Sequence, residues 1–183
     1  MNYCSHCGGD IEHKIPADDN RPRHICVACG TIHYQNPNIV AGTIPVYENK
    51  ILLCKRAIEP RHGFWTLPAG FMENQETTTE AAMRETWEEA EAKVEIQALY
   101  TVLNVPQIDQ VHMYFRATII NGEFGVGPES LETRLFTEEE IPWDELAFPT
   151  VKKTLRLFLA ERKHEQFGVH VDDIVRPPRD FEL

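Results

Sequence analysis

Residues 70–92 read GFMENQETTTEAAMRETWEEAEA, and this acidic stretch holds most of the information about fold and chemistry. Seven of its 23 residues are glutamate, and Arg84 is its only basic residue. Thr77 and Glu80 have the S/T-x-x-E spacing of a capping box, in which each side chain satisfies a backbone N–H of the other residue. The spacing predicts a helix over residues 77–90.

The predicted helix segregates its side chains. At about 100° per residue, three carboxylates share one sector of about 100°: Glu85, Glu88 and Glu89. The opposite side carries apolar residues that we expect to be buried: Met83, Trp87 and Ala90. Like charges three or four residues apart repel one another on a helix. The acidic side is therefore either a solvated surface or a site for hard divalent cations such as Mg²⁺ or Mn²⁺, which prefer oxygen ligands.

The order of residues in this stretch resembles the Nudix box, a motif with fixed spacings. The matching positions are Gly70, Glu76, Arg84, Glu85, Glu88 and Glu89. Two positions depart from the motif: Thr86 stands where an aliphatic residue is usual, and Glu91 stands in place of the late glycine. A left-handed helix cap would strain Glu91, so we expect the helix to run on slightly past residue 90.

The resemblance extends beyond the box. The segments YQNP, LLCKR, GFWTLPAGF, GPESLETRLF and LAF are similar to those of zinc-ribbon-bearing Nudix hydrolases, in particular the plant plastid FAD and ADP-ribose pyrophosphatase type. The resemblance implies an α/β fold, with an α/β/α sandwich around a mixed β-sheet. Bacterial NADH pyrophosphatases share the two-domain plan and carry an SQPWPFP-like signature after the box. Nothing of that kind follows Ala92, which argues against NADH as the main substrate.

Four of the five cysteines form two C-x₂-C pairs, separated by 18 residues. They are Cys4, Cys7, Cys26 and Cys29. Together they offer four thiolates for a tetrahedral structural zinc. Two disulfides are the alternative, which a reducing compartment disfavours. The fifth, Cys54, lies in an apolar run and is expected to be a small buried residue on a strand.

Composition and patterning give the domain plan. The chain has 183 residues and a formal net charge of -11, which disfavours nonspecific binding to nucleic acid. No leader or membrane-spanning run is visible, so we expect a soluble cytoplasmic protein. We expect a zinc ribbon over residues 1–35, a Nudix domain over residues 36–165 and an extended tail over residues 166–183. Strands are predicted over residues 39–47, 50–56, 94–105, 110–120 and 130–136, and a second helix over residues 149–163.

The resemblance also implies roles for single residues. Divalent metal would be held by the carboxylates of Glu85, Glu88 and Glu89 and by the backbone carbonyl of Ala69. A downstream acid would act as a further ligand or as the base, with Glu129 as first choice and Glu132 as second. Glu76 and Arg84 would pair structurally and orient the loop and the helix, with Gly70 completing the motif.

Substrate contacts are expected outside the box. Trp65, Phe64, Tyr114 and Phe148 could stack on a purine or a flavin, or could equally be core residues. Arg56 and Arg61 could meet phosphate or simply be solvated.

The function expected from these features is metal-dependent cleavage of a nucleoside diphosphate linked to another moiety, with FAD or ADP-ribose releasing AMP. The alternatives are an NADH pyrophosphatase, an RNA-decapping enzyme, or a zinc-ribbon binding module with a vestigial Nudix domain. A homodimer is expected, with no membrane partner.

Overall fold

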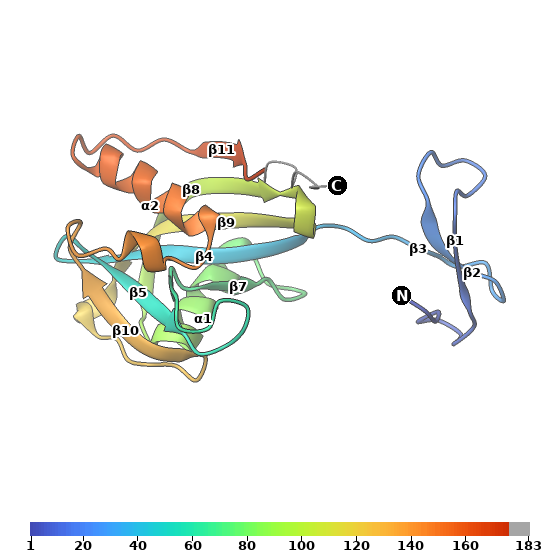
Figure 1. The fold of residues 1–183 in the computed structure, drawn as a ribbon, viewed down its shortest axis with the longest axis horizontal. Helices are drawn as coiled ribbons and strands as arrows, with labels where there is room; N and C mark the ends of the chain where they lie inside the picture. Colours follow the sequence, from blue (N-terminus) through green and yellow to red (C-terminus); the bar gives the residue numbers. More distant parts are fainter. Residues whose placement is uncertain (176–183) are drawn as a thin grey trace, which may run out of the picture. The chain divides into compact units, whose positions relative to one another are not determined.

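The computed structural model describes residues 1–175, and the chain divides into two compact units, Met1–Asn36 and Pro37–Leu183 (Figure 1). The first unit is a three-stranded antiparallel sheet of β1 (Ile11–Lys14), β2 (Arg23–Cys26) and β3 (Ile32–His33). Gly8 and Gly30 follow the second cysteine of each pair and have positive φ, 75° and 73°. Glycine adopts this backbone conformation without a steric penalty, so it closes the two cysteine turns.

The second unit is built on a mixed sheet with the strand order β10-β5-β4-β9-β8-β11. The strands are β4 (Asn38–Tyr47), β5 (Lys50–Arg56), β8 (Val94–Val105), β9 (Gln110–Ile119), β10 (Ser130–Phe136) and β11 (His170–Asp173). The pairs β4–β9 and β8–β11 are parallel, and the other neighbours are antiparallel. Short strands extend the sheet, because β6 (Trp65–Thr66) pairs with β5 and β7 (Ala69–Phe71) pairs with β4.

Two helices cover the two faces of this sheet: α1 (Thr78–Ala90) and α2 (Pro149–Arg162). Successive side chains on a strand point to opposite faces. Leu53 of β5 accordingly packs in one cluster with Val151 and Leu155 of α2, whereas its neighbour Cys54 packs in another with Ala90 of α1. The predicted mixed sheet between helices is therefore confirmed, and so is the burial of Cys54, which is 1% exposed.

The strands predicted from β-branched and apolar runs all form. Strand β8 spans the predicted residues 94–105, and β5 and β10 also match their predicted spans. The turn between β4 and β5 consists of Glu48 and Asn49, both with positive φ, as a tight hairpin requires. Short 3₁₀ turns occupy Pro106–Ile108, Ile120–Gly122 and Trp143–Glu145. The predicted tail over residues 166–183 includes β11, and residues 176–183 lie outside the described part.

The prediction that the apolar side of α1 is buried is wrong for Met83 and Trp87. Met83 is 37% exposed and Trp87 is 48% exposed. Lys93 lies over the outer Trp87 ring, 5.6 Å from its centroid. The buried side of α1 instead consists of Ala81, Ala82, Thr86, Glu89 and Ala90. Small side chains let the helix approach the sheet closely, and this turns the acidic sector partly toward the protein interior.

Thr86 is fully buried, and its hydroxyl explains how the chain tolerates a polar residue at a usually aliphatic position. Thr86 Oγ1 donates to the carbonyl of Ala82 at 2.7 Å and lies 2.7 Å from Thr43 Oγ1 on β4. A buried hydroxyl is costly only when it lacks a hydrogen-bond partner. The Ala82 carbonyl and the Thr43 hydroxyl together satisfy the hydroxyl of Thr86.

The expectation that α1 runs past residue 90 is also wrong. The helix ends at Ala90, and Glu91 adopts the left-handed conformation, with φ 48° and ψ 27°. Its N–H donates to the carbonyl of Trp87 at 2.7 Å. The chain must turn here to enter β8, so the glutamate accepts a conformation that glycine would adopt more easily.

Among the described residues, no helix is both long enough and apolar enough to cross a membrane.

Candidate active site

The acidic site is built on α1 and on the loop that connects it to β7. Thr77 is the N-cap of α1: its hydroxyl accepts from the N–H of Glu80 at 3.2 Å, and Glu80 Oε2 accepts from the N–H of Thr77 at 2.8 Å. This is the predicted capping box. It fixes where the helix begins, and therefore fixes which residues face the loop.

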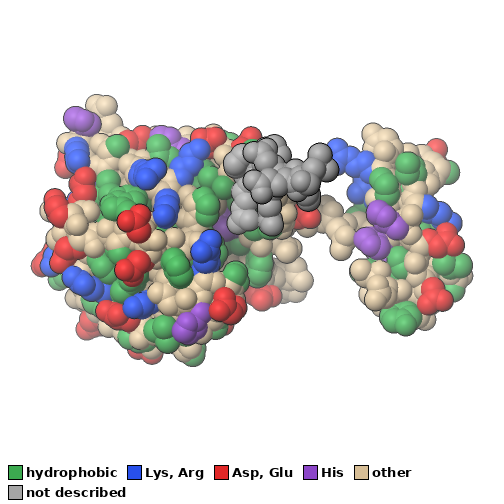
Figure 2. Space-filling view, viewed as in Figure 1, with side chains coloured by type: hydrophobic (Ala, Val, Ile, Leu, Met, Phe, Trp, Pro, Cys, Tyr) green, Lys and Arg blue, Asp and Glu red, His purple; other side chains and the backbone are tan. Residues whose placement is uncertain are grey.

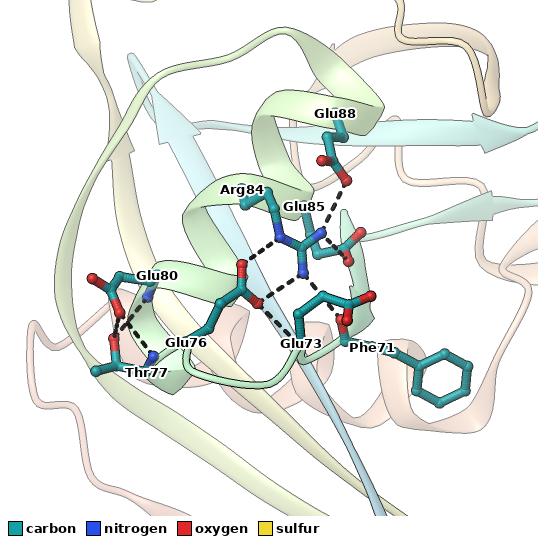
Figure 3. A network of polar contacts seen from close by, with 8 residues as sticks. All are labelled: Phe71, Glu73, Glu76, Thr77, Glu80, Arg84, Glu85 and Glu88. Atoms are coloured by element: carbon teal, nitrogen blue, oxygen red, sulfur yellow. Dashed lines mark hydrogen bonds and ion pairs between the residues drawn. The ribbon is translucent and has the colours of Figure 1, made fainter.

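Arg84 is the hub of the site (Figure 3). Its guanidinium donates two bonds to Glu76, from Nε at 2.6 Å and from Nη2 at 3.0 Å, which is the contact implied by the resemblance. Nη2 also donates to the carbonyl of Phe71, and Nη1 donates to Glu85 at 2.7 Å and Glu88 at 2.9 Å. A planar guanidinium suits such a multiple role because its donors have fixed directions. One side chain thus joins β7, the loop and α1.

Glu85 lies against the backbone of Gly70. A Cβ atom placed at Gly70 would overlap the Glu85 carboxylate. The Glu85 side chain is 13% exposed. Burial raises the pKa of Glu85 above its usual value, Arg84 lowers it, and the charges of Glu88 and Glu129 raise it further. Glu85 is therefore a carboxylate in a crowded acidic setting.

Glu89 is the most buried acid of the site, at 7% exposure. Its Oε2 accepts a hydrogen bond from the N–H of Ala69 at 3.2 Å. Burial raises the pKa of Glu89 to about 8. The hydrogen bond from Ala69 lowers this pKa, and the negative charge of Glu85 raises it further. Desolvation and like charge both favour the neutral acid. In this structure the carboxylate therefore lacks sufficient positive charge around it.

The two downstream acids differ in their relation to this cluster. The negative charge of Glu129 raises the pKa of both Glu85 and Glu89, which places Glu129 within reach of the site. Its carbonyl also accepts a hydrogen bond from Ala57 N at 2.8 Å. Glu132 is exposed on β10, opposite Lys55 of β5. The charge interaction favours Glu129 over Glu132 as the downstream acid, and its role stays a prediction.

The donor set fits a hard divalent cation. Carboxylate oxygens are the ligands that Mg²⁺ and Mn²⁺ prefer, and added positive charge would offset the raised pKa values of Glu85 and Glu89. The oxygens are not gathered for binding, however. Arg84 holds Glu85 and Glu88, while Glu89 turns toward Ala69. Within residues 1–175, the four paired cysteines form the only group of three or more candidate ligand side chains whose ligand atoms all lie within 4.8 Å of one another.

The four cysteines of the first unit meet as the spacing predicts, and none forms a disulfide. Cys4 Sγ lies 3.8 Å from Cys29 Sγ, and Cys7 Sγ lies 3.4 Å from Cys26 Sγ. Zn–S bonds of about 2.3 Å in a tetrahedron place sulfurs about 3.8 Å apart. A hydrogen bond with the Thr31 hydroxyl lowers the pKa of Cys29, whereas hydrogen bonds from the neighbouring thiols raise the pKa of Cys7, so the close sulfurs share protons that a bound metal would replace.

The residues proposed for substrate contact fall into two groups. Trp65 and Tyr114 are 6% and 2% exposed and belong to the core cluster under α2, so the core alternative applies to these two and neither ring offers a face to a ligand. Phe148 is half-buried, and Arg56 stacks over its ring at 5.1 Å. Phe64 is also half-buried, with Arg61 over its ring at 5.4 Å.

The sequence reasoning missed one aromatic residue beside the acids. Phe71 is 52% exposed, and its carbonyl accepts from Arg84 (Figure 3). Its ring projects away from the acidic side chains in this view. The signal was its position directly after Gly70, because a residue next to a motif glycine is held close to the motif's other members.

Comparisons with known proteins agree with this geometry. A family model described as "NUDIX domain" matches residues 37–158, and one described as "Nudix N-terminal" matches residues 2–35. The crystal structure of a NUDIX hydrolase from Nitrosomonas europaea is 53% identical, with a TM-score of 0.93, and the alignment covers 96% of this chain and 100% of that one.

Two curated relatives are more distant. The ADP-ribose pyrophosphatase of Methanocaldococcus jannaschii is 34% identical over 119 residues, which are 63% of this chain and 69% of the relative. The NAD-capped RNA hydrolase NudC of Chromobacterium violaceum is 36% identical over 93 residues, which are 50% of this chain and 33% of the relative. The match thus spans about a third of that relative's length.

Proposed function

The chain belongs to the Nudix hydrolase family and carries the family's N-terminal zinc-ribbon domain, and on that premise we propose a Mg²⁺- or Mn²⁺-dependent pyrophosphatase acting on nucleoside diphosphates linked to another moiety. FAD and ADP-ribose are the proposed substrates, and AMP is the common product. The observation that carries the proposal is the crowding of Glu85, Glu88, Glu89 and Glu129, with raised pKa values at Glu85 and Glu89.

The reaction adds one water across the pyrophosphate. The water oxygen forms a bond to one phosphorus, the bond from that phosphorus to the bridging oxygen breaks, and the bridging oxygen leaves on the other phosphate. ADP-ribose then gives AMP and ribose 5-phosphate, and FAD gives AMP and FMN. Divalent metal held by Glu85, Glu88, Glu89 and the Ala69 carbonyl would neutralise the diphosphate, polarise a phosphoryl oxygen and lower the pKa of the attacking water.

The protein's own groups have distinct tasks in this scheme. Arg84 orients Glu85 and Glu88 and ties them to the loop through Glu76. Glu129 is proposed either to accept the proton of the attacking water or to add a further oxygen ligand. Phe148 offers a half-buried ring beside Arg56 for contact with a base or a flavin, and Phe71 offers an exposed ring that points away from the acids.

A substrate panel tests the proposal. FAD, ADP-ribose and NADH are incubated with Mg²⁺ or Mn²⁺, and AMP release is measured. We expect hydrolysis of FAD or ADP-ribose that requires added metal. Faster hydrolysis of NADH would favour the alternative of an NADH pyrophosphatase. No hydrolysis of any member would favour a binding module with a vestigial catalytic domain.

We also propose that the four clustered cysteines hold one zinc ion and that the protein is a cytoplasmic homodimer. The thiolate set and the sulfur separations support the zinc. The dimer rests on the resemblance alone. Light scattering at a mass near the 21.1 kDa of one chain would contradict it.

A further inference from the structure

A cleft of about 560 Å³ lies beside α2. Its walls come from the loop between β5 and β6, from the segment that enters α2, and from the first turns of α2. The volume is in the range of small-molecule sites, about 300–1,000 Å³. None of the residues that line the cleft belongs to the acidic cluster. A ligand in the cleft would therefore be bound by groups other than the proposed metal ligands.

The cleft is cationic although the chain carries a net charge of -11. Four basic residues line it, Arg61, Lys152, Lys153 and Arg156, against one acid, Asp144. Lys153 forms an ion pair with Asp172. Within residues 1–175, Arg61, Lys152 and Arg156 have no carboxylate partner. Lys and Arg side chains lie over α2 on the face shown in Figure 2. Among the described residues, three of the four cations of the cleft are thus not paired with a carboxylate.

Aromatic rings hold the guanidinium groups at the rim. Arg61 stacks on Phe64 with 5.4 Å from its central carbon to the ring centroid, and Arg156 stacks on Trp143 at 5.6 Å. A guanidinium that lies over a ring can still direct N–H groups to the oxygens of a phosphate. The stacking lowers the conformational entropy lost on binding, which favours a defined anion site over a diffuse charged surface.

A short chain of contacts connects the cleft to the acidic cluster. Arg56 stacks over Phe148, which lines the cleft, at 5.1 Å. Arg56 on β5 is the register partner of Ser130 on β10, and Ser130 Oγ donates to the carbonyl of Glu89 at 2.7 Å. These contacts link the cleft to the backbone of Glu89 through β5 and β10, and the proposal below takes one extended substrate to span this link.

We propose that this cleft binds a phosphomonoester of the substrate, and that the enzyme prefers nucleoside diphosphate conjugates whose ribose carries an additional phosphate. The inference rests on the proposed function, because it assumes that the scissile pyrophosphate lies at the acidic cluster. The cleft then holds a second anionic group, which a simple dinucleotide lacks.

The test uses substrate pairs that differ by one phosphate: NADPH against NADH, and coenzyme A against dephospho-coenzyme A. We expect the phosphorylated member to have a kcat/KM at least about tenfold higher, through a lower KM. The reason is that hydrogen bonds to a charged group contribute enough binding free energy to change affinity by about this factor. Equal rates within a pair, or faster cleavage of the unphosphorylated member, would overturn the cleft assignment and leave the pyrophosphatase proposal standing. If no pair member, FAD or ADP-ribose is cleaved, the pyrophosphatase proposal itself fails.

Variants separate the cleft from the acidic site. Lys152→Gln and Arg156→Gln should each reduce the preference within a pair by about threefold or more, mainly through a higher KM for the phosphorylated member. Lys163→Gln is the matched control, because Lys163 follows α2 but pairs with Glu138 and does not line the cleft. Calorimetry with adenosine 2′,5′-bisphosphate gives a readout independent of turnover. Equal affinity for this ligand and AMP, or a preference unchanged in both cleft variants, would overturn the assignment.

Discussion

Gly70 and Glu85 are in direct contact, and the contact leaves no room for a side chain on the glycine. Gly70 belongs to β7 and Glu85 to α1, so the absence of a side chain on the strand leaves space for the carboxylate of the helix. The φ angle of Gly70 is not in the positive region that favours glycine. The motif glycine is therefore required here for space and not for backbone conformation.

Gly70→Ala should move the Glu85 carboxylate while keeping the backbone conformation accessible. A displacement of about 1 Å can reduce turnover on the order of 10²-fold. We expect a loss of this size in AMP release, with a small change in melting temperature. Gly168→Ala is the control, because a Cβ at Gly168 meets no atom within 4 Å. Parental activity in Gly70→Ala would show that the position of Glu85 is not critical.

Glu88→Gln and Glu89→Gln should each reduce turnover on the order of 10²–10³-fold, because each removes one negative charge from the proposed metal site. Their effects on stability should differ. The Glu88 side chain is 54% exposed, so its variant should melt like the parent. Glu89 is buried and ionises only near pH 8, so in metal-free protein its variant should melt like the parent at neutral pH and at a higher temperature above pH about 8. Full activity in both variants would mean that the acidic side of α1 is only a surface.

The pKa of about 8 at Glu89 predicts a pH dependence of stability in protein without added Mg²⁺ or Mn²⁺. The usual value is 4.5, so the folded state binds this proton more tightly than the unfolded state does. The free energy of unfolding contributed by Glu89 should be greatest below pH about 4.5, fall as the pH rises to about 8, and then level off. Thermal melts across this range should show the fall in the parent and a weaker fall in Glu89→Gln. Parallel profiles would contradict the assignment.

Glu91→Gly should stabilise the protein, because Glu91 adopts a left-handed conformation at the end of α1. Relief of this strain is worth about 1 kcal/mol, or about 2–4 °C in melting temperature for a protein of this size. Glu91→Ala keeps a Cβ atom and should give no comparable gain. A lower melting temperature in Glu91→Gly would show that contacts of the glutamate side chain, which lies against Gly125, outweigh the strain.

Metal analysis of reduced protein should find about one zinc per chain. Cys29→Ser should lose that zinc and the order of the first unit, because so small a domain depends on metal for folding energy. The second unit has its own core and should keep its melting transition. Reduced protein with no zinc, or with Cys4–Cys7 and Cys26–Cys29 disulfides, would refute the zinc site.

The sequence by itself determined the helices, strands and site residues whose signals lie within a few positions of one another or at a fixed spacing. The capping box of Thr77 and Glu80, the β-branched runs of β4 and β8, and the C-x₂-C turns each depend on residues a few positions apart. The acid spacing identified the motif, and the motif implied the contact of Glu76 with Arg84 that the structure contains.

Only the tertiary structure decided which side of α1 is buried and which cations gather at α2. Trp87 is exposed and Glu89 is buried because the alanines fit the sheet more closely than the large side chains do, and a helical projection contains no information about that fit. The parallel pairing of β4 with β9 and the cleft that collects Arg61, Lys152 and Arg156 join residues about 70 or more positions apart. Such contacts depend on the free energy of packing the whole unit, which no short stretch of sequence specifies.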